Sequence, residues 1–154
     1  MEPHHYNVTV TWNADRKGVI CSPELNDAKS VNGCIEVATP PEFPKGMPGI
    51  WSPEHLYTAA VSSCLMTTFL AIAENSRLDF VSFRCQSSGK LEVVDGKYRM
   101  TEVTLNPIVE IADATQHEKA LRVLTKAESN CLISNSITAK VSMNPVVEVA
   151  QFHD

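Results

Sequence analysis

The sequence predicts an α+β fold in which two helices pack on antiparallel sheet. Three observations support this class. Residues 5–38 contain three short strand-like segments, an apolar helix-like run follows at 51–75, and residues 79–150 contain a hairpin, a second helix and a last strand. The predicted order is therefore βββαββαβ. With 154 residues, 44% of them hydrophobic and 20% charged, the chain has the length and composition of one globular domain, which we place over residues 1–154.

Three strands are predicted in the first third of the chain. "HYNVTVTW" (5–12) alternates between apolar and polar residues, and "RKG" (16–18) predicts a turn before "GVICS" (18–22). A polar segment, "ELNDAKSVN" (24–32), separates these from a third strand, "GCIEVA" (33–38). The next segment, 39–50, holds four prolines and two glycines in twelve residues. It is therefore expected to be an ordered loop or a linker.

The central helix has a clear start signal. Ser52 is a favourable N-cap, Pro53 suits the first helical position, and Glu54 complements the helix dipole in the first turn. We expect the helix to end near Ser76. Apolar residues surround it on nearly every side, namely Ala59, Ala60, Val61, Leu65, Met66, Phe69, Leu70 and Ile72. This pattern predicts a central buried helix that needs a cover on both faces.

Residues 79–111 predict a hairpin that turns at Asp95–Gly96, with Val81, Phe83 and Cys85 facing inward. A second helix follows, in which Thr115 and Glu118 have the spacing of a capping box. Its apolar stripe consists of Ala120, Leu121, Leu124 and Ala127, and Cys131 extends it. Residues 136–150 are expected to form the last strand.

Charge and patterning exclude several classes of function. A net charge of −5 without any run of Lys or Arg makes nucleic acid an unexpected partner. The N-terminal residues have no basic segment followed by an apolar one, so we expect a cytoplasmic location. The apolar run 59–73 is shorter than the roughly 20 residues that cross a bilayer, so no membrane partner is expected. The histidines have no metal-ligand spacing, and we predict neither a metal site nor a cofactor; they are His4, His5, His55, His117 and His153.

The five cysteines are an odd number without a Cys-x-x-Cys pair, which disfavours a disulfide framework, a zinc ribbon and a thioredoxin-type motif. In a reducing compartment they are expected to be thiols. Cys21, Cys34 and Cys85 lie in strand-like segments without an evident activating group, so we expect them to be structural.

Cys64 and Cys131 differ, because each lies on a helix face meant for the interior and the two can meet when the helices pack. A peroxidatic thiol must be a thiolate near neutral pH and needs a second thiol within reach of its sulfenic acid. The N-terminus of the central helix cannot activate Cys64, because ten residues from Glu54 correspond to about 15 Å along the axis. We therefore expect a cation from elsewhere, with Arg16 or Lys17 as the candidates.

Three segments resemble the OsmC/Ohr family of thiol peroxidases, and the resemblance covers essentially the whole chain. The most specific is "SPEHLYTAAVSSC" (52–64), with Glu54 and Cys64 in register with the family motif. "NCLISNSI" (130–137) is similar to the family's Cys-Pro-x-Ser motif at Cys131 and Ser134, with Leu132 in place of the proline. "RKG" resembles the Arg-Asp-Gly turn of the Ohr branch at Arg16 and Gly18. The departures indicate an OsmC-like branch outside the two best-defined ones.

The resemblance implies a swapped homodimer with active sites at the subunit interface. In such a protein Cys64 attacks an organic hydroperoxide, with hydrogen peroxide as a further candidate substrate, Cys131 resolves the sulfenic acid as a disulfide, and Arg16 and Glu54 assist. A dithiol such as dihydrolipoamide, or another thiol, then reduces the disulfide. Since Glu54 lies about 15 Å from Cys64 on the same helix, a partner chain is expected to supply Glu54 and Arg16.

Two other functions stay open at this point. The same fold suits a non-catalytic protein that binds a small ligand or acts in stress, in which the thiols only pack. Thiol-dependent acyl transfer is a third hypothesis and needs a histidine within reach of Cys64. Phe43, Met47 and Trp51 of the proline-rich loop are candidates for the wall of an apolar pocket, although loop aromatics more commonly anchor a loop to the core.

Overall fold

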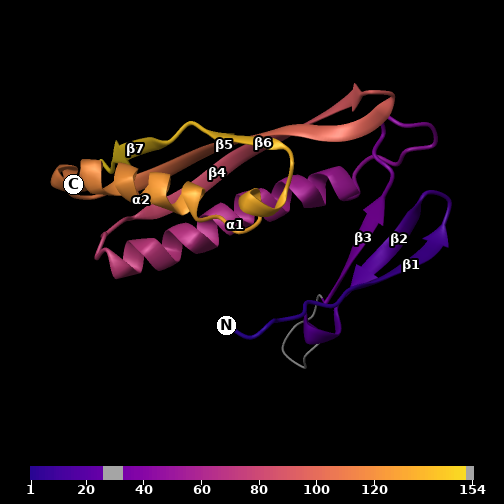
Figure 1. Cartoon of the computed structure of the whole chain (residues 1–154), viewed down its shortest axis with the longest axis horizontal. Helices are drawn as coiled ribbons and strands as arrows, with labels where there is room; N and C mark the ends of the chain where they lie inside the picture. Colours follow the sequence, from indigo (N-terminus) through magenta and orange to yellow (C-terminus); the bar gives the residue numbers. More distant parts are fainter. Residues whose placement is uncertain (26–32, 152–154) are drawn as a thin grey trace. The chain divides into compact units, whose positions relative to one another are not determined.

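The computed structural model describes residues 1–25 and 33–151, and the chain forms two compact units, Met1–Leu56 and Tyr57–Asp154. Figure 1 shows their helices and strands. The α+β class expected from the sequence is confirmed, because both units contain sheet and the second contains two helices. The single domain over 1–154 stays a prediction.

The first unit contains a three-stranded antiparallel sheet in the order β1-β2-β3, formed by β1 (Thr9–Ala14), β2 (Lys17–Cys21) and β3 (Cys34–Ala38). The short helix η1 (Pro23–Leu25) follows β2. The β1–β2 turn uses Asp15 at a φ of 51°. A side chain at Gly18 would collide with the carbonyl of Thr11 on β1, so this position requires glycine. The three predicted strands are confirmed, while 26–32 of the predicted polar segment lies outside the described residues.

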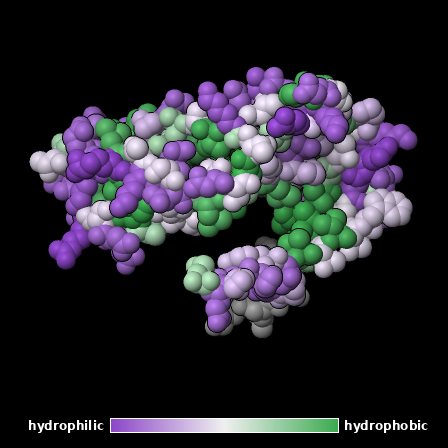
Figure 2. Space-filling model, in the orientation of Figure 1, coloured by the Kyte–Doolittle hydropathy of each residue, from purple (hydrophilic) through white to green (hydrophobic). Residues whose placement is uncertain are grey.

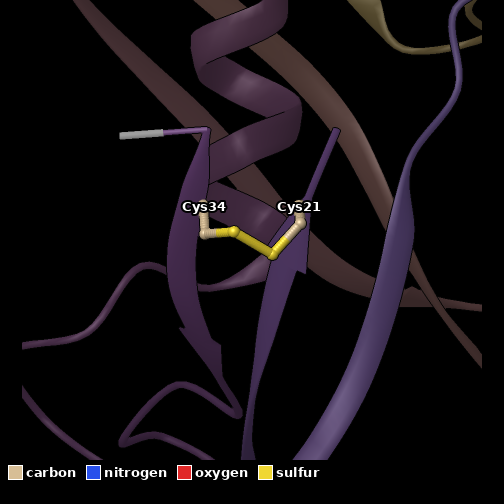
Figure 3. Close-up of a disulfide and its surroundings, with 2 residues drawn as sticks. All are labelled: Cys21 and Cys34. Atoms are coloured by element: carbon tan, nitrogen blue, oxygen red, sulfur yellow. A yellow bond between two sulfur atoms is a disulfide. The ribbon is translucent and has the colours of Figure 1, made fainter. Parts of the chain in front are cut away.

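Two of the expected free thiols form a disulfide in the structure, between Cys21 and Cys34 (Figure 3). These residues are direct partners in the β2–β3 register, with their Cα atoms 4.1 Å apart. The neighbouring N–H of Ser22 donates to the carbonyl of Gly33 at 3.1 Å, so Cys21 and Cys34 form the closely spaced, non-hydrogen-bonded type of pair. The expectation that both cysteines are thiols is thus corrected, because strand pairing places their sulfurs face to face.

The proline-rich segment 39–50 is a loop held by its own backbone. The N–H of Phe43 donates to the carbonyl of Pro40 at 3.1 Å, and the N–H of Met47 donates to the carbonyl of Thr39 at 2.9 Å. The chain then returns to β3, where the N–H of Ala38 donates to the carbonyl of Trp51 at 2.8 Å. The loop thereby fixes the start of the long helix α1 (Pro53–Asn75). Ser52 caps this helix as predicted, because its Oγ accepts the N–H of His55 at 3.1 Å.

The second unit is built on the hairpin β4 (Ser82–Val94) and β5 (Lys97–Ile111). Asp95 and Gly96 have φ angles of 51° and 76°, as the predicted two-residue turn requires. The predicted last strand is two strands, β6 (Lys140–Met143) and β7 (Val146–Val149), and both pair with β5 in parallel. This sheet is mixed, since the crossover through the second helix brings the chain back in the direction of β5.

The second helix, α2 (His117–Ser129), begins later than the predicted capping box. Its N-cap is Gln116, which makes no side-chain cap hydrogen bond. Asp113 instead caps a preceding 3₁₀ turn, η2 (Ala114–Gln116), by accepting the N–H of Thr115 at 2.9 Å. An acceptor two residues before Thr115 therefore takes the role that the sequence assigned to Thr115 itself.

The core of the second unit lies between α1, α2 and β5. Phe69 is fully buried and stacks on Phe83 at a ring-centroid distance of 5.0 Å. Phe83 and Cys85 face the core as predicted, whereas Val81 precedes β4 and is 50% exposed. The other core residues are Leu78, which follows α1, and residues of α1 (Val61, Leu65 and Ala73), β5 (Val103, Leu105, Val109 and Ile111) and α2 (Ala120, Val123, Leu124 and Ala127).

The opposite face of α1 is apolar and exposed in a single chain. Met66 and Leu70 are 40% and 42% exposed. Figure 2 shows that apolar side chains, drawn in green, reach the surface in several places. By length and hydropathy alone, the 23 residues of α1 suffice to cross a membrane, so the shortness of the run 59–73 is not a sound argument against crossing. A core helix passes the same test, and one face of α1 packs on the core of the second unit.

Candidate active site

The packing of α1 against α2 brings Cys64 and Cys131 together. Lys119, in the first turn of α2, donates from Nζ to the carbonyl of Arg77, just beyond the end of α1, at 3.2 Å. Cys131, just after α2, faces the carbonyl of Val61 in the first half of α1, with Sγ 4.0 Å from the oxygen. The helices are therefore antiparallel. This places Cys131 beside the turn of α1 that carries Cys64, within hydrogen-bonding reach of its sulfur.

Cys64 is 8% exposed, and its surroundings stabilise the thiolate. Burial alone would raise the pKa of Cys64, but hydrogen bonds to the sulfur outweigh it and hold this pKa below its ordinary value. The donors are the backbone N–H of Ile133, the thiol of Cys131, the hydroxyl of Thr68 and the backbone N–H of Leu132. Thr68 lies one turn further along α1, with Oγ1 3.9 Å from the Cys64 sulfur. Cys64 thus has the character of a nucleophilic thiol.

Cys131 is fully buried, and its pKa is shifted in the opposite direction. Burial raises the pKa of Cys131, and the charge and hydrogen bond of Cys64 raise it further. The hydroxyl and backbone N–H of Ser134 act against this but do not outweigh it. At neutral pH Cys131 therefore keeps its proton and can donate it in a hydrogen bond to Cys64.

The donors at Leu132 and Ile133 come from the turn that follows α2. The carbonyl of Cys131 accepts the N–H of Asn135 at 3.0 Å, and η3 (Ser134–Ser136) continues this turn. The first N–H groups of such a turn have no partner within it and point toward its N-terminal side, where they attract negative charge. They supply the stabilisation for which the sequence argument required a cation. Thr68, Leu132 and Ile133 were not predicted as functional from the sequence, although a threonine four residues after Cys64 was a readable signal.

Arg16 and Glu54 both belong to the first unit, where they line one pocket of about 440 Å³. The two residues predicted to assist Cys64 therefore line the same pocket. Arg16 is in the β1–β2 turn, and Glu54 is in the first turn of α1. The rest of the lining is mainly apolar and consists of Val10, Trp12, Lys17, Gly18, Val37, Ala38, Thr39, Pro40, Phe43 and Pro53.

The three loop residues proposed for a pocket wall do not share one pocket. Phe43 lines the pocket of Arg16 and Glu54. Met47 lines a second hollow with Asp15, Arg16 and Lys45. Trp51 contacts His55 edge-on at 6.3 Å, and Ser52 Oγ lies 2.6 Å from His55 Nδ1. His55 is thus an exposed side chain tied to the helix cap. Within residues 1–25 and 33–151, no group of three His, Cys, Asp or Glu side chains has a metal-binding arrangement.

The model of the OsmC-like protein family matches residues 46–145 of the chain. The chain belongs to the OsmC-like family. This match includes both cysteines of the pair and Glu54, while Arg16 lies before it. An uncharacterised protein of Bacillus subtilis, YmaD, is 27% identical over 146 residues, which cover 93% of each chain.

Solved structures of OsmC-like proteins share the fold. An OsmC-like protein of unknown function from Vibrio cholerae has a TM-score of 0.80 at 23% identity and covers 94% of this chain and 100% of its own. An organic hydroperoxide resistance protein OsmC from Legionella pneumophila has a TM-score of 0.72 at 19% identity, and the match covers 97% of this chain and 100% of that protein. The organic hydroperoxide resistance protein OhrB of Bacillus subtilis has a TM-score of 0.62 at 17% identity, and the match covers 96% of this chain and 98% of that protein. At these identities the likeness concerns the fold.

Proposed function

We propose that this protein is a cysteine-based peroxidase that reduces organic hydroperoxides. The observation that carries the proposal is the pair Cys64 and Cys131, two adjacent buried thiols whose pKa values are shifted in opposite directions. A peroxidase of this type needs one thiol that is readily ionised and a second that stays protonated beside it. The names of the hydroperoxide resistance proteins from Legionella pneumophila and Bacillus subtilis support the same class of substrate.

The first step is a two-electron oxidation of Cys64. Its thiolate attacks one oxygen of the peroxide, the O–O bond breaks, and Cys64 becomes a sulfenic acid while the other oxygen leaves as an alkoxide that takes up a proton to form the alcohol. The donors of Leu132, Ile133 and Thr68 raise the share of thiolate at neutral pH. This share sets the rate, because the thiol form is a poor nucleophile.

The second step forms the disulfide. While Cys64 is a thiolate, its charge helps to keep Cys131 protonated. Oxidation to the neutral sulfenic acid removes that charge, so the pKa of Cys131 falls toward the value that burial and the donors of Ser134 set together. Cys131 then attacks the sulfur of Cys64, and hydroxide leaves as water with the proton of Cys131. An external dithiol, of the lipoyl type or another class, reduces the disulfide by exchange and is itself oxidised.

Arg16 and Glu54 are proposed to assist from a partner chain in a homodimer, as the resemblance implies. Their shared pocket within the first unit supports this role, because it combines an apolar wall for an alkyl group with an Arg that can orient a peroxide oxygen. The dimer, the swapped arrangement and the cytoplasmic location are part of this proposal.

The test adds one equivalent of cumene hydroperoxide to the reduced protein and maps disulfides by mass spectrometry. We expect a Cys64–Cys131 bond in the wild type and a sulfenic acid at Cys64, captured by dimedone, in Cys131→Ser. Cys64→Ser should abolish peroxide consumption, whereas Cys85→Ser, which alters a half-buried free thiol, should leave it unchanged. Full turnover in Cys64→Ser, or no Cys64–Cys131 disulfide, would refute the proposal.

A second candidate is a non-catalytic protein that binds small apolar ligands. The pocket of about 440 Å³ favours it, since this volume lies within the usual range of ligand sites. It predicts retention of an apolar ligand after Cys64→Ala and a slow reaction of Cys64 with peroxide. Acyl transfer has no such support within the described part of the second unit, where the single imidazole, His117, pairs with Glu118 at 3.5 Å.

A further inference from the structure

A second pocket, separate from the cysteine pair, lies at the other end of the antiparallel helix pair. It has a volume of about 280 Å³ and is lined by Ile72 in the last turn of α1, by Ser76 just after that helix, and by Lys119, Arg122, Val123 and Lys126 of α2. Three of its six lining residues are cations, and none is an acid. This is unusual in a chain whose net charge is −5.

The three cations lie on one face of α2, because spacings of three and four residues bring side chains to neighbouring positions on a helix. The ion pairs among the described residues do not include Lys119, Arg122 or Lys126. Lys119 has a structural role, because its Nζ donates to the carbonyl of Arg77 and so caps the C-terminal end of α1. The side chains of Arg122 and Lys126 are exposed and make no hydrogen bond or ion pair with residues 1–25 or 33–151.

Like charges held on one helix face repel one another, so an unpaired set of this kind is destabilising unless an anion joins it. Glu118, the neighbour of Lys119 in sequence, contacts His117 at 3.5 Å. Ser76 adds a neutral donor to the pocket, because its hydroxyl makes no hydrogen bond within the described parts of the chain. The pocket therefore offers donors and positive charge without a competing carboxylate in its lining.

We propose that this pocket binds the phosphate group of a small molecule. Arg122 would grip two phosphate oxygens with its planar fork, and Lys126 and Lys119 would supply the remaining charge. A phosphate monoester carries nearly two negative charges at neutral pH, which matches Arg122 and Lys126 together better than a single carboxylate does. The volume is at the low end for ligand sites, so it suits the phosphate end of a ligand or a free phosphate.

The test titrates the ¹⁵N-labelled full chain with inorganic phosphate, glycerol phosphate and acetate at constant ionic strength. We expect saturable shifts of the amides in 72–77 and 119–126 with both phosphates and a far weaker response to acetate. Tighter binding of glycerol phosphate than of inorganic phosphate would identify a phosphate ester as the ligand class, and the reverse order would identify free phosphate. Arg122→Gln and Lys126→Gln should each weaken binding about tenfold, as expected for the loss of one charge-assisted contact.

Arg84→Gln is the matched control, because it removes an exposed cation on β4 outside the pocket. It should leave phosphate binding within about twofold of the wild type, as expected for an unbound surface charge. The proposal is overturned if acetate binds as tightly as phosphate, if the shifts do not saturate, or if Arg84→Gln weakens binding as much as Arg122→Gln. Peroxide turnover is not a readout here, so the outcome is independent of the proposed peroxidase function.

Discussion

At the scale of single residues, the two thiols differ in what donates to them. Cys64 receives hydrogen bonds from two backbone N–H groups, a thiol and a hydroxyl, and these outweigh its burial. Cys131 is buried more completely and also lies next to the developing charge of Cys64. The direction of each pKa shift therefore follows from position: one sulfur lies at the N–H side of the 131–136 turn, and the other lies inside the packed helix pair.

Thr68→Val tests this account of Cys64. The loss of a hydroxyl donor should raise the pKa of Cys64 and slow its alkylation by iodoacetamide at pH 7 several-fold, because the thiolate fraction falls. In the wild type the alkylation rate should reach its midpoint at a lower pH than for an ordinary thiol, and Thr68→Val should move this midpoint upward. Alkylation is followed by mass spectrometry of the Cys64 peptide across pH.

Thr67→Val is the matched control, since the hydroxyl of Thr67 donates to the carbonyl of Cys64 at 3.2 Å and not to its sulfur. It should leave the pH midpoint in place. Equal shifts in both variants would mean that the helix, rather than the donor at Thr68, sets the reactivity of Cys64.

At the scale of elements, the Cys21–Cys34 disulfide closes the β2–β3 connection, with a sequence separation of 13 residues. A cross-link of this loop length is worth about 3 kcal/mol of unfolding free energy in the chain-entropy account. The double variant Cys21→Ser/Cys34→Ser should lose stability of this order in urea, measured without reductant. Cys85→Ser is the control, and the wild type in dithiothreitol should lose the same amount. An unchanged midpoint would show that the two sulfurs do not form a bond in solution.

The two faces of α1 give a second prediction at this scale. Leu65 is fully buried in the core, and Met66, the next residue, is 40% exposed. Leu65→Ala should cost about 2–5 kcal/mol of unfolding free energy, because it removes core contacts and leaves a cavity. Met66→Ala should cost less than about 0.5 kcal/mol in a monomeric chain. Urea unfolding followed by circular dichroism compares the two, and a larger loss in Met66→Ala would show that this face is covered.

The same elements show which features of the fold and the site could be predicted from the sequence. The start of α1 at Ser52 and Pro53 was readable because capping depends on local residue types. The meeting of Cys64 and Cys131 was expected from their helix faces, but Cys131 lies in the turn just after α2 and not on the helix itself. The disulfide was not, because Cys21 and Cys34 oppose each other in only one β2–β3 register. The donors of Leu132 and Ile133 are backbone groups, which side-chain patterns do not reveal, so the sequence argument required a cation instead.

At the scale of the whole molecule, a single chain leaves apolar surface uncovered. Val10 and Trp12 of β1 are 63% and 74% exposed, and Met66 and Leu70 of α1 are also exposed. Exposed apolar residues that gather on single elements commonly mark a surface for association. A second copy of this chain is the partner that the family resemblance implies, and it would supply the cover that the apolar pattern of α1 requires.

If a second copy covers this surface, the molecular mass in solution and the peroxide turnover should change together. In solution the protein should have about twice the chain mass of 16.9 kDa by light scattering. Leu70→Glu should shift it toward the monomer, because a carboxylate buried in an apolar interface without a partner is strongly unfavourable. Thr125→Glu, which adds the same charge at an exposed position of α2, should leave the mass unchanged.

If the partner supplies Arg16 and Glu54, peroxide turnover should fall with the dimer fraction. The lowered pKa of Cys64 should survive, since its donors belong to the same unit of one chain. A monomer with full turnover would exclude the partner's role and leave the Cys64–Cys131 chemistry to a single chain.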